Sequence, residues 1–85
     1  MKEFTYTIKD ELGIHARPAG LLAKEAKKFA SACTITKGAQ TKKLTQLMGI
    51  MSLAVKKGEE VIVKAEGADE EQAIAALKAF FEANL

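Results

Sequence analysis

The segment EEVIVKAE, residues 59–66, decides how this chain folds. It is the most apolar strand candidate in the sequence, and it lies between two turn-forming residues, Gly58 and Gly67. A strand that is apolar along most of its length is covered by neighbours, so we expect it inside a sheet rather than at an edge.

Two helices are expected next to this strand along the chain. After Gly67, Asp69 and Gln72 have the spacing of a capping box, which predicts the start of a last helix. Before Gly58, the apolar stretch over roughly residues 45–53 predicts a short helix. The core side of the last helix is expected to contain Ala73, Ile74, Leu77 and either Phe80 or Phe81.

The first half of the chain predicts three more strands and a longer helix. Residues 33–37 and 40–44 are typical of a hairpin around Gly38, and residues 19–30 have a helical period. Residues 2–8 alternate like a half-buried strand, with one apolar face made of Phe4, Tyr6 and Ile8. The helix over 19–30 is expected to bury Ala19, Leu22, Ala23, Ala26, Phe29 and Ala30.

The predicted order of elements is β-α-β-β-α-β-α, within one domain over residues 1–85. Strands with one polar face, joined partly by a hairpin, favour an antiparallel sheet with helices on one side. We therefore expect an α/β (α+β) open-faced sandwich, with four antiparallel strands covered on one face by three helices.

The composition is that of a soluble globular protein, with 48% hydrophobic and 28% charged residues. Cys33 is the only cysteine, so we expect a small buried side chain, no disulfide framework and a reducing compartment. The first ten residues contain no apolar run, so we expect no signal peptide, no membrane insertion and a cytoplasmic location. A net charge of +2 is too small to indicate a nucleic-acid partner.

The segment GIHARPAG, residues 13–20, contains the only histidine, arginine and proline of the chain. It lies between the first strand and the first helix, where Gly13 supplies a turn and Pro18 fits a first helical turn. The preference of proline for the first helical position puts the helix cap at Arg17, whereas a cap at His15 puts the proline third. In both cases His15 lies at a helix N-terminus.

A helix N-terminus favours anions, because the amides of Ala16 and Arg17 are unpaired and the peptide dipoles are aligned. The same positive end and Arg17 favour the uncharged imidazole of His15, which is a nucleophile. A phosphohistidine is the natural product, since Arg17 and the amides would stabilise a phosphoryl group. The alternative is a histidine that only caps the helix. With no second histidine and no acidic residue near in the sequence, we expect no metal and no cofactor.

A docking surface is expected beside this cluster. On the face of the first helix opposite the core lie Arg17, Gly20, Leu21, Lys24 and Lys28, a basic ridge with one exposed leucine. An ordinary solvated lysine face is the alternative. Gly20 would permit close approach of a partner, and the short apolar helix over 45–53 cannot bury every side.

These residues carry a resemblance to a known family. GIHARPAG resembles the active-site signature of HPr, the histidine-containing phosphocarriers of the bacterial phosphoenolpyruvate-dependent sugar phosphotransferase system. LMGIMSLAVKKGEEV (47–61) and AEGADEEQAIAAL (65–77) resemble the second helix and the final strand and helix of that family. The resemblance thus covers essentially the whole chain, and it implies a four-stranded antiparallel sheet covered by three helices.

The resemblance also implies a carrier rather than a free-standing enzyme. It implies that His15 accepts a phosphoryl group on Nδ1 from phospho-enzyme I and donates it to sugar-specific IIA proteins or domains, with Arg17 accompanying the phosphoryl group and Pro18 in the same loop. It places Leu47, Met48 and Met51 beside the active site, and it turns Ile50 and Leu53 inward. We expect the chain to be a monomer. We also expect its partners to present acidic, partly apolar surfaces to it.

The chain departs from the family at the start of the second helix. Many relatives have a regulatory serine there, but this chain has Gln46, so we expect no serine-type phosphorylation. Thr45 is expected to be an N-cap, with a displaced phosphorylation site on Thr45 or Ser52 as the alternative. A regulatory docking module of the same fold that acts by binding alone is the alternative function, which the presence of His15 disfavours.

Overall fold

The computed structural model describes residues 1–85, which form one four-stranded sheet and three helices. The elements in chain order are β1 (Lys2–Thr7), α1 (Ala16–Ala26), β2 (Ala32–Lys37), β3 (Gln40–Lys43), α2 (Leu47–Ser52), β4 (Glu60–Glu66) and α3 (Glu70–Asn84). This order and the sheet confirm the fold expected from the sequence. No helix of the chain combines the length and the apolar character that a membrane crossing requires.

The strand over residues 60–66 lies inside the sheet, as its apolar character predicts. The strand order is β1-β4-β2-β3, and β4 pairs antiparallel with β1 on one side and with β2 on the other. Val61, Val63 and Ala65 point into the core and are fully buried. The hairpin of β2 and β3 turns at Gly38, whose φ of 60° is the left-handed conformation that glycine adopts readily.

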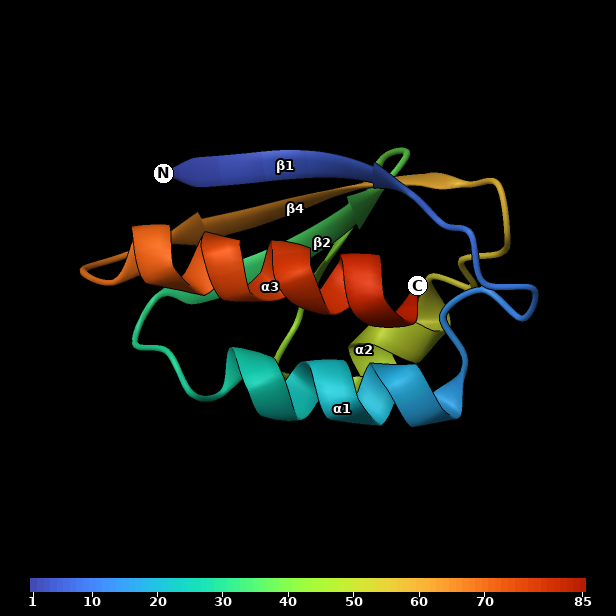
Figure 1. Ribbon diagram of the computed structural model, residues 1–85, viewed down its shortest axis with the longest axis horizontal. Coiled ribbons are helices and arrows are strands. Elements are labelled where there is room, and N and C mark those ends of the chain that lie inside the picture. Colours follow the sequence, from blue (N-terminus) through green and yellow to red (C-terminus); the bar gives the residue numbers. More distant parts are fainter.

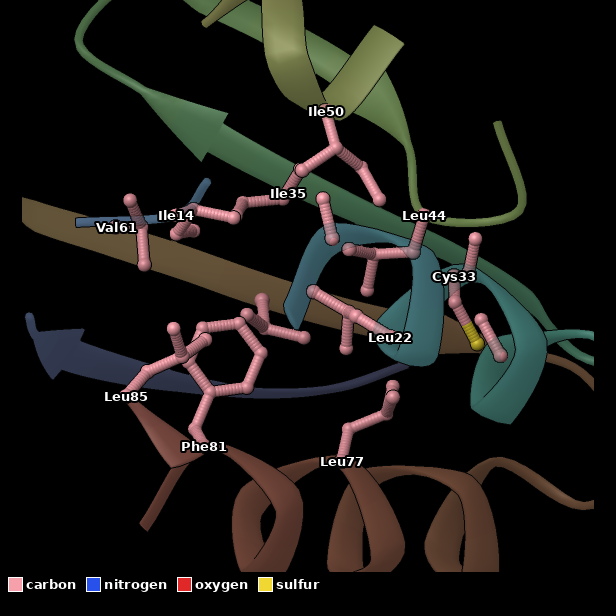
Figure 2. Close-up of a cluster of buried hydrophobic side chains, with 14 of the residues drawn as sticks. Ile14, Leu22, Cys33, Ile35, Leu44, Ile50, Val61, Leu77, Phe81 and Leu85 are labelled. Atoms are coloured by element: carbon pink, nitrogen blue, oxygen red, sulfur yellow. The ribbon is translucent and has the colours of Figure 1, made fainter. Parts of the chain in front are cut away.

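The three helices lie on one face of this sheet, and the other face is open (Figure 1). The core contains 19 buried residues, and side chains from all three helices converge on those of β2 and β4 (Figure 2). Leu22 of α1, Ile50 of α2 and Phe81 of α3 are each fully buried there. Cys33 is also buried, as expected, and burial together with the nearby charge of Asp69 raises the pKa of its thiol.

The first helix is shorter than its periodicity predicts. It ends at Ala26, so Phe29 is only half-buried and Ala30 is exposed. The reason lies in a distant part of the chain, because the backbone amides of Ala30 and Ser31 each donate to the Asp69 carboxylate at 2.9 Å. A backbone that turns toward this carboxylate cannot continue the helix.

The predicted capping box at the start of α3 does not form. Asp69 is the N-cap, but its side chain bonds no amide of α3 and accepts instead from the amides of residues 30 and 31 and from the Ser31 hydroxyl. These bonds lower the pKa of Asp69, and the bond from the Ser31 hydroxyl has the largest effect. The Glu70 carboxylate, rather than Gln72, accepts the Gly67 amide at 3.2 Å. Farther along α3, Phe81 is buried and Phe80 is half-buried.

The second helix is also shorter than expected, and its cap differs. It spans Leu47–Ser52, and Gln46 rather than Thr45 is the N-cap, with extended backbone and no side-chain cap bond. Here the chain leaves β3 in a tight turn, in which the Gln46 amide donates to the Lys43 carbonyl at 3.2 Å. The backbone rather than a hydroxyl therefore sets the start of this helix.

Candidate functional site

The loop between β1 and α1 packs closely against the backbone of Val55. Gly13 is buried with φ +66°, and a Cβ added there would lie 2.1 Å from the Val55 carbonyl oxygen. The neighbouring Ile14 amide donates to that carbonyl at 3.0 Å, and the Ile14 side chain is buried. Gly13 is thus required by close approach as well as by its turn, and it sets where His15 emerges.

His15 is the N-cap of α1, which settles the choice between the two predicted caps and makes Pro18 the third helical residue. Its backbone is extended and its carbonyl accepts the Ala19 amide at 3.0 Å, but its side chain makes no capping hydrogen bond. The imidazole is 36% exposed, so it is accessible from solvent. This geometry argues against a histidine that serves only as a helix cap.

The surroundings of the imidazole suit an anion. The backbone amides of Ala16 and Arg17, in the first turn of α1, have no acceptor within the chain. The Arg17 side chain is exposed and forms no ion pair. Two amides without acceptors and a guanidinium without an ion pair therefore lie beside the imidazole of His15.

A shallow pocket surrounds His15 and contains two residues that sequence reasoning missed. Its lining consists of Asp10, His15, Arg17, Pro18, Leu21 and Asn84. Asn84 comes from the end of α3, which binds the loop because the amides of residues 9 and 10 donate to the Leu85 carbonyl at 2.6 and 2.9 Å. The sequence offers no local signal for this contact.

The second missed residue, Asp10, corrects the expectation that no acidic group lies near His15. Its Oδ1 is 3.9 Å from Nε2 of His15. A signal for it existed, because Asp10 and Gly13 occupy the first and fourth positions of a turn, where these residue types are favoured. The Gly13 amide donates to the Asp10 carbonyl at 3.0 Å, which closes this turn.

A groove adjoins the pocket and contains most of the predicted docking residues. Arg17 and Leu21 line both hollows, so the groove adjoins the pocket that contains His15. Leu21 and Leu47 are 48% and 41% exposed, and they make the groove partly apolar. The full lining is Arg17, Gly20, Leu21, Ala23, Lys24, Lys27 and Leu47, which contains no acidic side chain.

The remaining predicted docking residues behave differently. Lys28 lies outside this lining and bonds Glu25 at 3.0 Å, while Lys27, which was not predicted, takes its place. Met48 is 77% exposed, but Met51 is half-buried and packs against the core. Ile50 and Leu53 face inward, as the family resemblance implied. The exposed side of α2 therefore consists mainly of Leu47 and Met48.

The positions considered for regulatory phosphorylation lie around α2. Gln46 is exposed at the N-cap and Thr45 is half-buried. Ser52 is exposed, and its hydroxyl donates to the Gly49 carbonyl at 2.7 Å.

Comparison with known proteins identifies similar chains over nearly the full length. The family model for the phosphorylation site of the HPr component of the phosphotransferase system matches residues 2–83. Phosphocarrier protein HPr of Mycoplasma genitalium is 44% identical over 85 residues, covering 99% of this chain and 97% of that protein. The crystal structure of HPr-C-His from Thermoanaerobacter tengcongensis is similar with a TM-score of 0.93 and 46% identity, covering 98% of this chain and 93% of that one.

A second structure from that organism shows an assembly. It is described as an HPr dimer, and it has a TM-score of 0.78 and 46% identity, covering 98% of this chain and 95% of that chain.

Proposed function

The chain belongs to the HPr family and is a phosphocarrier of the phosphotransferase system, and from this premise we propose that His15 is the residue that carries the phosphoryl group. It accepts the group from phospho-enzyme I and passes it to sugar-specific IIA proteins. The observation that carries this proposal is the half-exposed imidazole, free of capping bonds, at a helix start with two unpaired amides and Arg17 beside it.

The transfer step follows from this arrangement. The lone pair of Nδ1 attacks phosphorus as the bond between phosphorus and the donor nitrogen breaks, and the donor imidazole leaves with that electron pair. Arg17 and the two amides donate to the phosphoryl oxygens and offset their charge. We propose that the partner proteins supply the remaining catalytic groups. The chain then carries the phosphoryl group between enzymes and is not itself an enzyme.

The groove supports a docking role for the first two helices. Arg17, Lys24 and Lys27 give it positive charge, and the exposed Leu21 and Leu47 give it an apolar part. Met48, next to Leu47 in α2, is also exposed. We propose that partners present acidic and apolar side chains to it, with association that weakens as salt rises. His15, Arg17 and the groove all lie on one copy of the chain, so we propose a working monomer; light scattering should show the mass of one chain.

The experiment mixes the chain with phosphoenolpyruvate and enzyme I and measures phosphate bound to the protein. An acid-labile, base-stable phosphate is expected, and His15→Ala should abolish it. Arg17→Ala should fold normally and slow transfer by roughly 100-fold, the usual effect of losing one donor to a developing anion. A phosphate retained by His15→Ala would contradict the proposal, and unfolding of Arg17→Ala would contradict the role of that side chain. Partner binding without any phosphate would indicate the regulatory docking module instead.

For regulation, we propose that serine-type phosphorylation is absent, because Gln46 has no hydroxyl group. Incubation with the kinase of a related protein and ATP should give no acid-stable phosphate. Such a phosphate on Thr45 or Ser52 would contradict this proposal.

A further inference from the structure

We propose that Asp10 is a positioning residue for His15, and this inference rests on the proposed role of His15 as phosphoryl carrier. The Asp10 carboxylate faces Nε2 of the imidazole and keeps the proton on that nitrogen. The lone pair of the neutral ring then remains on Nδ1, where the phosphoryl group is received.

The first support is that Asp10 is held and the imidazole is not. Oδ1 of Asp10 accepts the Leu12 amide at 2.8 Å, its carbonyl accepts the Gly13 amide at 3.0 Å, and its own amide donates to the Leu85 carbonyl at 2.9 Å. By contrast, the His15 side chain makes no capping bond. The loop therefore fixes the carboxylate, and the carboxylate orients the ring.

The second support is that Asp10 is the only residue whose carboxylate lies within 4.0 Å of a nitrogen of the ring. Its Oδ1 lies 3.9 Å from Nε2, with the two side chains 31% and 36% exposed. This distance is longer than a hydrogen bond, but such bonds are often long in the absence of the partner and shorten in the reacting complex.

The chemistry needs a group at this place. A neutral imidazole carries one proton, and a hydrogen bond at one nitrogen decides which nitrogen holds it. When Nδ1 attacks phosphorus, the ring gains positive charge while Nε2 keeps its proton, and a facing carboxylate stabilises that charge. When a IIA nucleophile then attacks phosphorus, the bond to Nδ1 breaks and its electron pair returns to the ring. Asp10 therefore acts in both transfers without taking up the proton.

The test must separate this role from the turn that Asp10 closes. Asparagine forms the same side-chain turn as aspartate, so Asp10→Asn keeps the acceptor for Leu12 and removes the charge, while Asp10→Ala removes both. Glu11→Gln is the matched control, because it removes one negative charge from the same loop. Glu11 bonds Lys57 at 2.6 Å and does not line the His15 pocket.

Two measurements are made on the full chain of each variant. Phosphoryl transfer from phospho-enzyme I gives kcat and KM, and ¹⁵N NMR of the imidazole gives the fraction of neutral ring protonated at Nε2. We expect Asp10→Asn and Asp10→Ala to lower kcat by roughly tenfold with KM unchanged, by analogy with the loss of a group that orients a metal-binding histidine. The Nε2-protonated fraction should fall in Asp10→Ala, and Glu11→Gln should match the wild type in both measurements.

The inference is overturned if the kcat of Asp10→Asn lies within twofold of that of the wild type or of Glu11→Gln. It is also overturned if the Nε2-protonated fraction is unchanged in Asp10→Ala. A rise in KM without a fall in kcat also overturns it, because that result assigns Asp10 to docking. If the wild type accepts no phosphate at all, the proposed function fails, and the NMR measurement still decides whether Asp10 orients the ring.

Discussion

The position of His15 depends on a residue that carries no side chain. Gly13 lies so close to Val55 that a methyl group there would overlap the carbonyl oxygen, and its backbone is left-handed as well. Because the Ile14 amide bonds the same carbonyl, a shift at Gly13 moves the residue directly before His15.

We therefore predict that Gly13→Ala destabilises the fold by about 3 kcal/mol, since it combines overpacking with the cost of a left-handed alanine. Urea denaturation measures this change, and phosphate acceptance by His15 should fall in parallel. Gly38→Ala is the control, because Gly38 also has positive φ but nothing lies within 4 Å of its missing Cβ. Equal losses for the two variants would show that contact with Val55 is unimportant.

Ala54 presents the opposite case, a side chain where glycine is favoured. It is the only residue other than glycine with positive φ, at 49°. The Lys37 ammonium donates to the carbonyls of Leu53 and Ala54 at 3.1 and 3.3 Å, and it pairs with Glu59 at 3.1 Å. These bonds hold the strained turn that follows α2.

We predict that Ala54→Gly stabilises the protein by about 0.5–1 kcal/mol, because relief of the left-handed strain exceeds the added freedom of the unfolded chain. The free energy of unfolding in urea checks this. Ala39→Gly, in an exposed turn without positive φ, should destabilise by about 0.4–1 kcal/mol. A loss of stability in Ala54→Gly would indicate that the strain is absent.

At the scale of elements, α1 has two faces with separate tasks. One face packs Ala19, Leu22 and Ala26 into the core, and the other lines the groove next to α2. Gly20 lies in the middle of the groove face, where nothing within 4 Å restricts an added side chain. The free protein therefore gives Gly20 no packing role, which leaves partner approach as its proposed use.

We predict that Gly20→Ala raises stability by about 0.5–1 kcal/mol, because alanine is the better helix residue. It should also raise KM for phospho-enzyme I, because the added methyl group keeps the partner's backbone at a distance. Denaturation and transfer kinetics on the same variant check the two effects separately. An unchanged KM would rule out close approach at Gly20.

At the scale of the whole molecule, three carboxylates connect distant segments and make stability depend on pH. Asp69 binds the loop before β2, Glu59 binds the Lys56 amide and Lys37, and Glu70 binds the N-terminal ammonium and the Gly67 amide. Hydrogen bonds lower the pKa of all three carboxylates. The largest contribution comes from the Ser31 hydroxyl for Asp69, from the Lys56 amide for Glu59 and from the N-terminal ammonium for Glu70.

A carboxylate with a lowered pKa in the folded state takes up protons more readily once unfolded. Its contribution is therefore present above the unfolded pKa of about 4 and is lost as pH falls through the folded pKa. We predict that the urea concentration at the midpoint of unfolding decreases as the pH is lowered from about 5 to about 3. Asp69→Asn should lower stability at pH 7 and flatten this dependence, while Glu82→Gln, at an exposed position without an ion pair, should leave it unchanged. A flat profile in the wild type would contradict the prediction.

Much of the architecture could be predicted, because it depends on periods of two and 3.6 residues that the chain carries locally. The central place of residues 60–66, the hairpin at Gly38 and the buried face of α1 up to Ala26 are of this kind. Two of the predictions that failed, the end of α1 and the capping box of α3, involved competition between hydrogen-bond partners. The Asp69 carboxylate can bond an amide of its own helix or the amides of residues 30 and 31. No local sequence pattern indicates the second pairing.

The candidate site also has a part that the local sequence predicts and a part that depends on long-range contacts. The sequence alone determined that the only histidine, with Arg17 and Pro18, lies at the start of a helix, because these residue types and their spacing are properties of one continuous segment. Only the tertiary structure decided that Asp10 faces the imidazole and that Asn84 borders it, because both depend on the loop being bound to Leu85 and Val55. The physical reason is that contacts across the fold arise from how the core closes, and core closure depends on all the elements at once.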